Sequence, residues 1–166
     1  MNAVAPAALT RYQPTPDIRL TLPDGSSDSI RSTRFRHDRI VFFLPSAPST
    51  LRESFLAELS EHRNVWEDWG AHAWVLATDS LPRFEIRTIH TATISPAAHH
   101  QYGGEQDRIV AVFLDFRGTV METFIATESS PLNWHETAET VRWIAVQEPE
   151  CGVCGVDPVW QQHLSE

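Results

Sequence analysis

Two cysteines separated by two residues, Cys151 and Cys154, have the types and spacing best suited to chemistry in this 166-residue chain. Two thiols at this spacing can close a redox-active disulfide ring or bind one metal ion from a turn. A complete zinc site needs two further ligands, for which the sequence offers His135, Asp157 and His163. Three interpretations are open: a redox pair, a metal-binding knuckle, and two thiols without a catalytic role in an accessible tail.

A buried strand, a proline-containing loop and a helix are predicted over residues 40–69. The continuous apolar run at residues 40–44 is typical of a strand covered on both faces, and Pro45 and Pro48 end it. Thr50 followed by Glu53 matches a capping box, which predicts a helix that starts there and runs to Trp69 with one apolar face. A cysteine in the first turn of such a helix would have a stabilised thiolate, but this turn contains none.

The other patterned segments predict a mixed sheet flanked by helices. Alternating and apolar runs predict strands over residues 17–22, 71–77, 108–115 and 120–125. The strand over 71–77 follows a helix and is expected to pair in parallel with the strand over 40–44, whereas 108–125 reads as an antiparallel hairpin. A short helix is predicted from Pro96 and a C-terminal helix from Asn133, ended by Pro149.

Length and charge indicate one ordinary globular domain. The formal net charge of −9, with 13 Lys and Arg residues spread along the chain, argues against a nucleic-acid-binding surface. No apolar run is long enough to cross a bilayer, and the N-terminal residues lack a signal-peptide pattern, so a cytoplasmic location without membrane contact is expected. The predicted organisation is a flexible leader (1–16), one domain (17–147) and a C-terminal tail (148–166).

Five segments in the predicted order carry a resemblance to a known superfamily. They are Leu22-Pro23-Asp24-Gly25, the apolar run 40–44, the strand and Thr-Asp stretch 70–79, the Ala-x-x-x-Tyr-Gly helix end 98–103, and the hairpin 108–120. Together they resemble the thioredoxin-like superfamily, in particular its redoxin branch of peroxiredoxin-like, alkyl hydroperoxide reductase/thiol-specific antioxidant proteins. The resemblance implies an α/β fold of three layers, with a central mixed β-sheet between helices.

The segment that would hold the active site departs from the family pattern. Peroxiredoxins carry Pro-x-x-x-(Thr/Ser)-x-x-Cys, with the cysteine in the first helical turn. Here Pro45 and Ser49 fit, and Arg52 stands where the cysteine is expected. A guanidinium cannot replace a thiolate as the nucleophile toward a peroxide or a disulfide. Pro45, Ser49, Thr50 and Arg52 are therefore predicted to bind rather than react, together with Arg108, which the resemblance matches to an arginine near the family's active site.

These observations give two hypotheses of different classes. The first is thiol–disulfide chemistry through Cys151 and Cys154, without a cofactor, acting on a protein or small-molecule thiol or disulfide; a homodimer is compatible with it. The second is a non-catalytic thioredoxin-fold module that binds a partner through residues 45–50 and the tail. A zinc-binding knuckle at the two cysteines is a third interpretation, and the histidines elsewhere show no metal-ligand spacing.

Overall fold

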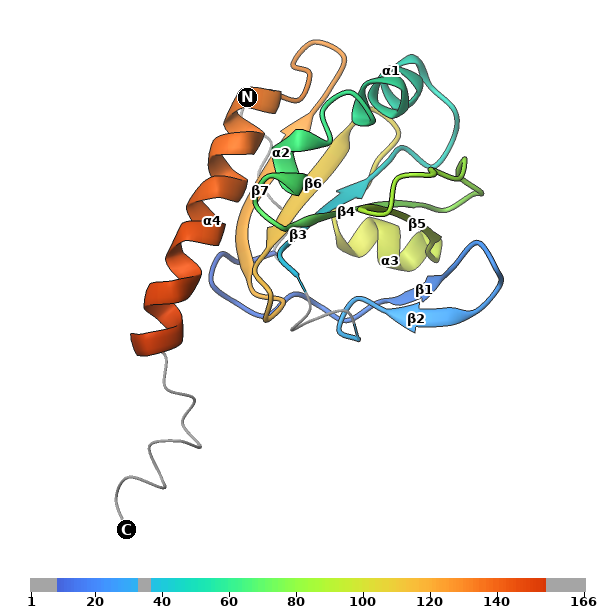
Figure 1. The fold of residues 1–166 in the computed structure, drawn as a ribbon. Coiled ribbons are helices and arrows are strands. Elements are labelled where there is room, and N and C mark those ends of the chain that lie inside the picture. The colour runs from blue at the N-terminus through green and yellow to red at the C-terminus, as the bar shows by residue number, and fades with distance from the viewer. Residues whose placement is uncertain (1–8, 33–36, 155–166) are drawn as a thin grey trace.

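The apolar run that starts at residue 40 forms an interior strand of a seven-stranded mixed sheet (Figure 1). The structure, a computed structural model, describes residues 9–32 and 37–154, with side chains described up to residue 147. In spatial order the strands are β2 (Ser27–Ser29), β1 (Arg19–Thr21), β5 (Ile89–Thr93), β4 (His72–Ala77), β3 (Arg39–Phe43), β6 (Ile109–Leu114) and β7 (Val120–Ala126). The described helices are α1 (Thr50–Leu59), α2 (Asn64–Glu67), α3 (Pro96–Gln101) and α4 (Trp134–Cys154).

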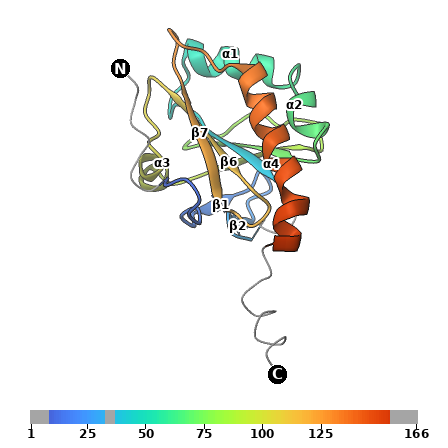
Figure 2. The same cartoon turned by 90° about the vertical axis from the view of Figure 1, so that its left-hand side faces the viewer.

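The sheet lies between two helical layers, because its interior strands are apolar on both faces. Ile40, Phe42 and Leu44 point to one face, where they pack with residues of α1, α2 and α4. Val41 and Phe43 point to the other face, toward α3 and the N-terminal segments. Figure 2 shows α3 and α4 on opposite sides of the sheet. The predicted three-layer α/β fold with a central mixed sheet is therefore confirmed.

The predicted strand pairings are also observed. β3 and β4 pair in parallel, with Val41 opposite Trp74, so α1 and α2 form the crossover of a βαβ unit. β6 and β7 form the antiparallel hairpin, and β3 pairs antiparallel with β6. Because β3 and β4 run in the same direction, their carboxyl ends reach the same edge of the sheet. That edge holds the site described below.

The interior strand β5 was missed by the sequence patterns. β5 lies between β4, with which it pairs in parallel, and β1, with which it shares the single pair Thr21–Thr93. Its sequence, Ile-His-Thr-Ala-Thr, has polar residues at three of five positions, so it lacks both the apolar run and the clean alternation of a typical strand. Pairing with β4 supplies the backbone hydrogen bonds of a strand that its sequence pattern does not predict.

The predicted helix over residues 50–69 is wrong in its length. α1 ends at Leu59, and a turn separates it from the four-residue α2. The break lets both Leu59 and Trp66 become fully buried, whereas Trp69, predicted on the apolar face, is 39% exposed. Gly70 then takes a positive φ of 70°, as expected of a glycine that ends a helical segment.

Two predicted boundaries are also corrected. Residues 9–16 are not a free leader, since Leu9 and Thr15 are buried and the Tyr12 N–H donates to the carbonyl of Val120. The Thr15 hydroxyl also lies 2.8 Å from the hydroxyl of Tyr102, whose pKa is raised by burial to about 12. At the other end, α4 continues past Pro149 to Cys154. A proline inside a helix removes one hydrogen bond and crowds the preceding turn, at a cost of about 3 kcal/mol, which is why the sequence predicted an end there.

Candidate functional site

The site begins where β3 ends and the chain turns into α1. Pro45 is buried directly after the strand and has no N–H to continue the ladder. The N-cap of α1 is Ser49, whose Oγ accepts a hydrogen bond from the Arg52 N–H at 3.2 Å. The helix thus starts at Thr50, as predicted, but its cap is Ser49 and not the Thr50 of the capping-box pattern, since Thr50 is the first helical residue and is exposed.

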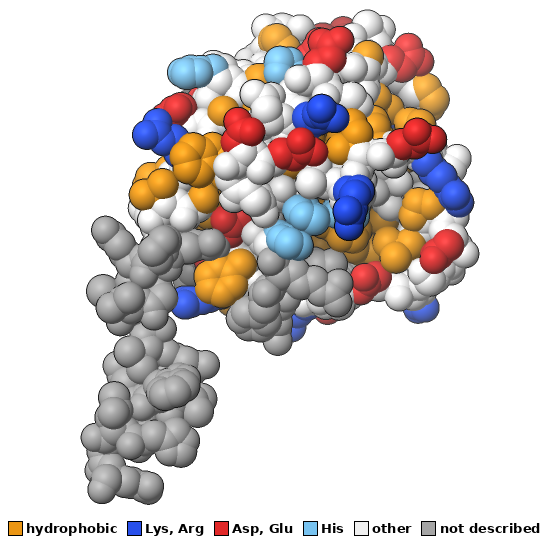
Figure 3. Space-filling view, viewed as in Figure 1, with side chains coloured by type: hydrophobic (Ala, Val, Ile, Leu, Met, Phe, Trp, Pro, Cys, Tyr) orange, Lys and Arg blue, Asp and Glu red, His pale blue; other side chains and the backbone are white. Residues whose placement is uncertain are grey.

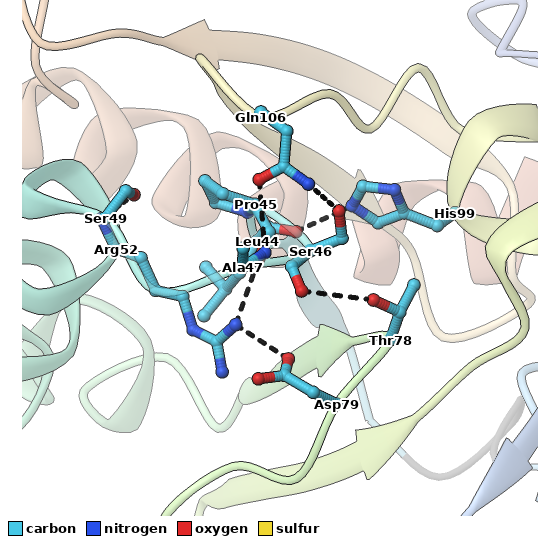
Figure 4. Close-up of polar contacts among 10 residues, drawn as sticks. All are labelled: Leu44, Pro45, Ser46, Ala47, Ser49, Arg52, Thr78, Asp79, His99 and Gln106. Carbon is cyan, nitrogen blue, oxygen red and sulfur yellow. Dashed lines mark hydrogen bonds and ion pairs between the residues drawn. The ribbon is translucent and has the colours of Figure 1, made fainter.

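Arg52, in the first turn of α1, points into the protein instead of into solvent. The residue is 5% exposed, and its Nη1 donates to the Pro45 carbonyl at 3.1 Å and to Asp79 Oδ1 at 2.7 Å (Figure 4). Asp79 lies just beyond β4, so the parallel pairing of β3 and β4 brings the two charges together. The ion pair ties the loop after β3 to the loop after β4.

The backbone of residues 44–47 is also held by three side chains from other segments (Figure 4). His99 of α3 donates from Nε2 to the Leu44 carbonyl at 2.6 Å. Gln106 accepts from the Ala47 N–H at 3.1 Å and also bonds the Ser46 hydroxyl. The Thr78 hydroxyl lies 3.4 Å from the Ser46 carbonyl. Three segments distant in sequence therefore fix this loop.

His99 reaches the loop only because the residue beside its ring is glycine. A Cβ added to Gly104 would overlap the imidazole of His99. The Gly104 N–H in turn donates to the His99 carbonyl at 2.9 Å. The pattern of two adjacent histidines gave no sign of this role. In the structure His99 is buried, whereas His100 is exposed.

A cavity of about 550 Å³ lies beside the start of α1. It is lined by Ser49, Leu51, Gln106, Asp107, Thr127, Glu128 and Ser129. Arg108, predicted as a binding residue, pairs with Glu105 at 3.1 Å and Asp107 at 3.2 Å, both close to it in sequence. The structure thus brings Pro45, Ser49 and Arg52 together at one place, and gives Arg108 partners on its own loop.

This arrangement supplies hydrogen-bond donors and charge but no nucleophile among its described side chains. The guanidinium of Arg52 only donates, and the hydroxyl of Ser49 is engaged as the helix cap. Asp79 and Gln106 were missed as site residues. The signal for Asp79 was available, because it follows a strand expected to run parallel to the one before the loop.

The cysteines belong to the other end of the molecule. Residues 151 and 154 lie in the last turn of α4, whose carboxyl end is far from the start of α1 in both views (Figures 1 and 2). Their thiols lie outside the described side chains. Residues 155–166, including His163 and Asp157, lie outside the described part of the chain.

Comparison with known proteins identifies the fold. No protein-family model and no curated protein sequence matches the chain. Among solved structures, peroxidoxin BcpB from Mycobacterium tuberculosis superposes with a TM-score of 0.62 at 15% identity, covering 82% of this chain and 98% of that one. The fold is that of the peroxiredoxins.

Two further peroxiredoxins agree with this assignment. The yeast mitochondrial 1-Cys peroxiredoxin gives a TM-score of 0.66 at 9% identity, over 86% of this chain and 79% of that one. The reduced 2-Cys peroxiredoxin of Plasmodium vivax gives 0.61 at 13% identity, over 84% and 85%. The thioredoxin-like, peroxiredoxin-like fold predicted from the sequence is therefore confirmed.

Within this peroxiredoxin fold, two other expectations can be compared with the described residues. Residues 9–32 and 37–154 contain no helix with the length and hydropathy needed to span a bilayer. Residues 9–32 and 37–147, whose side chains the structure describes, contain no group of three or more His, Cys, Asp or Glu side chains placed to hold a metal ion. The described part of the predicted site is thus an ion-paired loop without a metal-binding cluster.

Proposed function

We propose that the protein is a peroxiredoxin-like redox protein whose thiol–disulfide chemistry is carried by Cys151 and Cys154. The observation that supports this is Arg52, which lies in the first turn of α1 of a peroxiredoxin fold and is ion-paired with Asp79. Arg52 takes the position at which the family pattern expects the reactive cysteine. Because the chain has two cysteines in all, any thiol chemistry has to use this pair.

The proposed reaction transfers two electrons between the pair and an external disulfide. The thiolate of one cysteine attacks a sulfur of the partner disulfide and forms a mixed disulfide, releasing the first partner thiol. The second cysteine then attacks the mixed disulfide, closes the Cys151–Cys154 bond and releases the second partner thiol. Two protons accompany the two electrons, so the pair is oxidised and the partner disulfide becomes two thiols.

The position of the pair on α4 favours disulfides over peroxides as partners. At the carboxyl end of a helix the macrodipole is negative and disfavours a thiolate, the opposite of the first-turn position used by peroxiredoxins. A thiol without this activation exchanges with disulfides but is a slow nucleophile toward a peroxide. The expected partner is a protein or small-molecule disulfide.

Equilibration with glutathione redox buffers, followed by alkylation of free thiols, tests this function. The wild-type protein should lose both free thiols together as the buffer becomes more oxidising. Cys151→Ser and Cys154→Ser should each trap one mixed disulfide with glutathione, and the double variant should take up none. Arg52→Met, which removes the positive charge at the start of α1, should titrate as the wild type does. Thiols that stay free throughout, or one bound zinc ion per chain that chelators remove, would overturn the redox assignment.

A non-catalytic binding module is the second candidate, favoured by the rigid loop of residues 44–47. Arg52, His99 and Gln106 hold that loop in one conformation, as a preformed recognition surface requires. The two candidates predict that different substitutions abolish the protein's function in a cell. If the Cys151→Ser/Cys154→Ser double variant restores a deletion strain and Gln106→Ala does not, the binding module replaces the redox proposal.

A further inference from the structure

Two histidines meet on adjacent parallel strands, at the sheet edge opposite the Arg52 loop. His72 is the first residue of β4, and His90 is the second residue of β5, paired in register with Trp74. The Nδ1 atom of His72 lies 2.8 Å from the Nε2 atom of His90. The ring planes are nearly parallel, with 13° between them, and the ring centroids lie 5.0 Å apart.

Aromatic neighbours fix both rings in place. The ring of His37 stacks on His72 at a centroid distance of 3.8 Å, and the indole of Trp74 stacks on His90 at 4.7 Å. Both histidines are only half-buried, so solvent reaches them. Figure 3 shows histidine side chains gathered on this open face of the molecule.

We propose that His72 and His90 form a two-imidazole binding site for a divalent transition metal ion of the copper(II) or nickel(II) type. Metal–imidazole bonds are about 2.0 Å long, so two nitrogens 2.8 Å apart would subtend roughly 90° at the ion. That angle matches neighbouring positions of a square-planar or octahedral ion, whereas a tetrahedral zinc ion prefers a wider one. Water would fill the remaining positions, because no third described ligand converges on the pair.

The site needs two changes to take up the ion. In the metal-free protein the nitrogens face each other, and one N–H lies between them. That proton has to move to the other nitrogen of its ring, and each ring has to turn by roughly 45° so that both lone pairs point to the ion. Burial, together with His37 and His90, lowers the pKa of His72 to about 4, so the ring is already neutral near pH 7. Metal binding there requires a change of tautomer and not the loss of a proton.

Copper(II) titration of the full-length, untagged chain tests the proposal. The titration uses the Cys151→Ser/Cys154→Ser background, since copper(II) oxidises thiols; the result is therefore independent of the redox proposal. Calorimetry should give one strong site, and electron paramagnetic resonance should show splitting from two nitrogens. His72→Asn and His90→Asn should each weaken binding by more than about tenfold. His135→Asn, an exposed histidine at the start of α4, should leave it unchanged.

Thermal unfolding with and without copper(II) separates loss of the site from loss of the fold. Copper(II) should raise the melting temperature of the parent and of His135→Asn but not of His90→Gln, which keeps a hydrogen-bonding side chain at that position. Equal copper affinity in the parent and in both the His72 and His90 variants would overturn the proposal. A spectrum from one nitrogen, or one that changes equally with His135→Asn, would show adventitious surface binding and overturn it as well.

Discussion

In a peroxiredoxin, the reactive cysteine lies at the amino end of a helix. In this chain, the amino end of α1 provides that environment, whereas the cysteines lie at the carboxyl end of α4. The start of α1 has the free N–H groups, the favourable dipole and a firmly held loop, but it carries Arg52. The end of α4 carries both cysteines of the chain, at the helix terminus that disfavours a thiolate. The comparison teaches that a fold supplies the electrostatic environment of a site, whereas the residue at one position decides which chemistry that environment serves.

The largest effect is expected from breaking the ion pair at the start of α1. Arg52→Met keeps the apolar stem but leaves Asp79 and the Pro45 carbonyl without their donor. Breaking a buried pair costs several kcal/mol, and because the Asp79 side chain is 41% exposed we expect about 2 kcal/mol of unfolding free energy to be lost. Urea unfolding measures this loss of unfolding free energy. Arg142→Met, in an exposed pair on α4, should cost less than about 0.5 kcal/mol; equal losses would show that the Arg52 pair is no more than a surface contact.

Crowding the loop should also destabilise the α1 end. Gly104→Ala places a methyl group against the His99 ring and should cost about 1–2 kcal/mol, measured by thermal or urea unfolding. Val146→Ala, at a position on α4 that is 57% exposed, should change stability by less than about 0.5 kcal/mol. A Gly104→Ala protein as stable as the wild type would mean that His99 does not hold the Leu44 carbonyl.

Single-thiol proteins compare the two helix ends directly. Arg52→Cys in the Cys151→Ser/Cys154→Ser background places one thiol in the first turn of α1, and Cys151→Ser alone leaves one thiol at the end of α4. The first-turn thiol should react about tenfold faster with iodoacetamide at pH 7, because free N–H groups stabilise its thiolate. Equal rates would remove the electrostatic distinction between the two ends.

The smallest effect is expected at the helix cap. Ser49→Ala removes the acceptor of the Arg52 N–H and should cost about 1 kcal/mol in urea unfolding. Thr50→Ala is the matched control, since Thr50 is the first helical residue and not the cap. If Thr50→Ala were the more costly change, Thr50 and not Ser49 would cap the helix, as the capping-box pattern indicates.

The sequence predicts the framework of the fold better than its local details. The apolar runs of β3 and β6 are strong signals because burial on both faces leaves no alternation to interpret. β5 was not predicted because His90 and Thr91 interrupt its apolar pattern. Its pairing with the neighbouring strand β4 identifies it as a strand. The helix break after Leu59 follows from tertiary packing of Trp66, which periodicity alone does not encode.

The candidate site was predicted in part, for the same physical reason. Pro45, Ser49 and Arg52 are close in sequence, so one motif names them all. Asp79, His99 and Gln106 come from three other segments and meet the loop only when the sheet forms. Contacts of this kind depend on the order of the strands in the sheet. A prediction that lacks β5 therefore does not indicate them.

Intact-mass spectrometry across a glutathione redox series tests the central claim most directly. If Cys151 and Cys154 are the working pair, the oxidised protein should lose about 2 Da, recover that mass on reduction, and show no such change in the Cys151→Ser/Cys154→Ser variant. An unchanged mass under oxidising poise, with both thiols open to alkylation, would contradict the claim and leave the fold as a binding module.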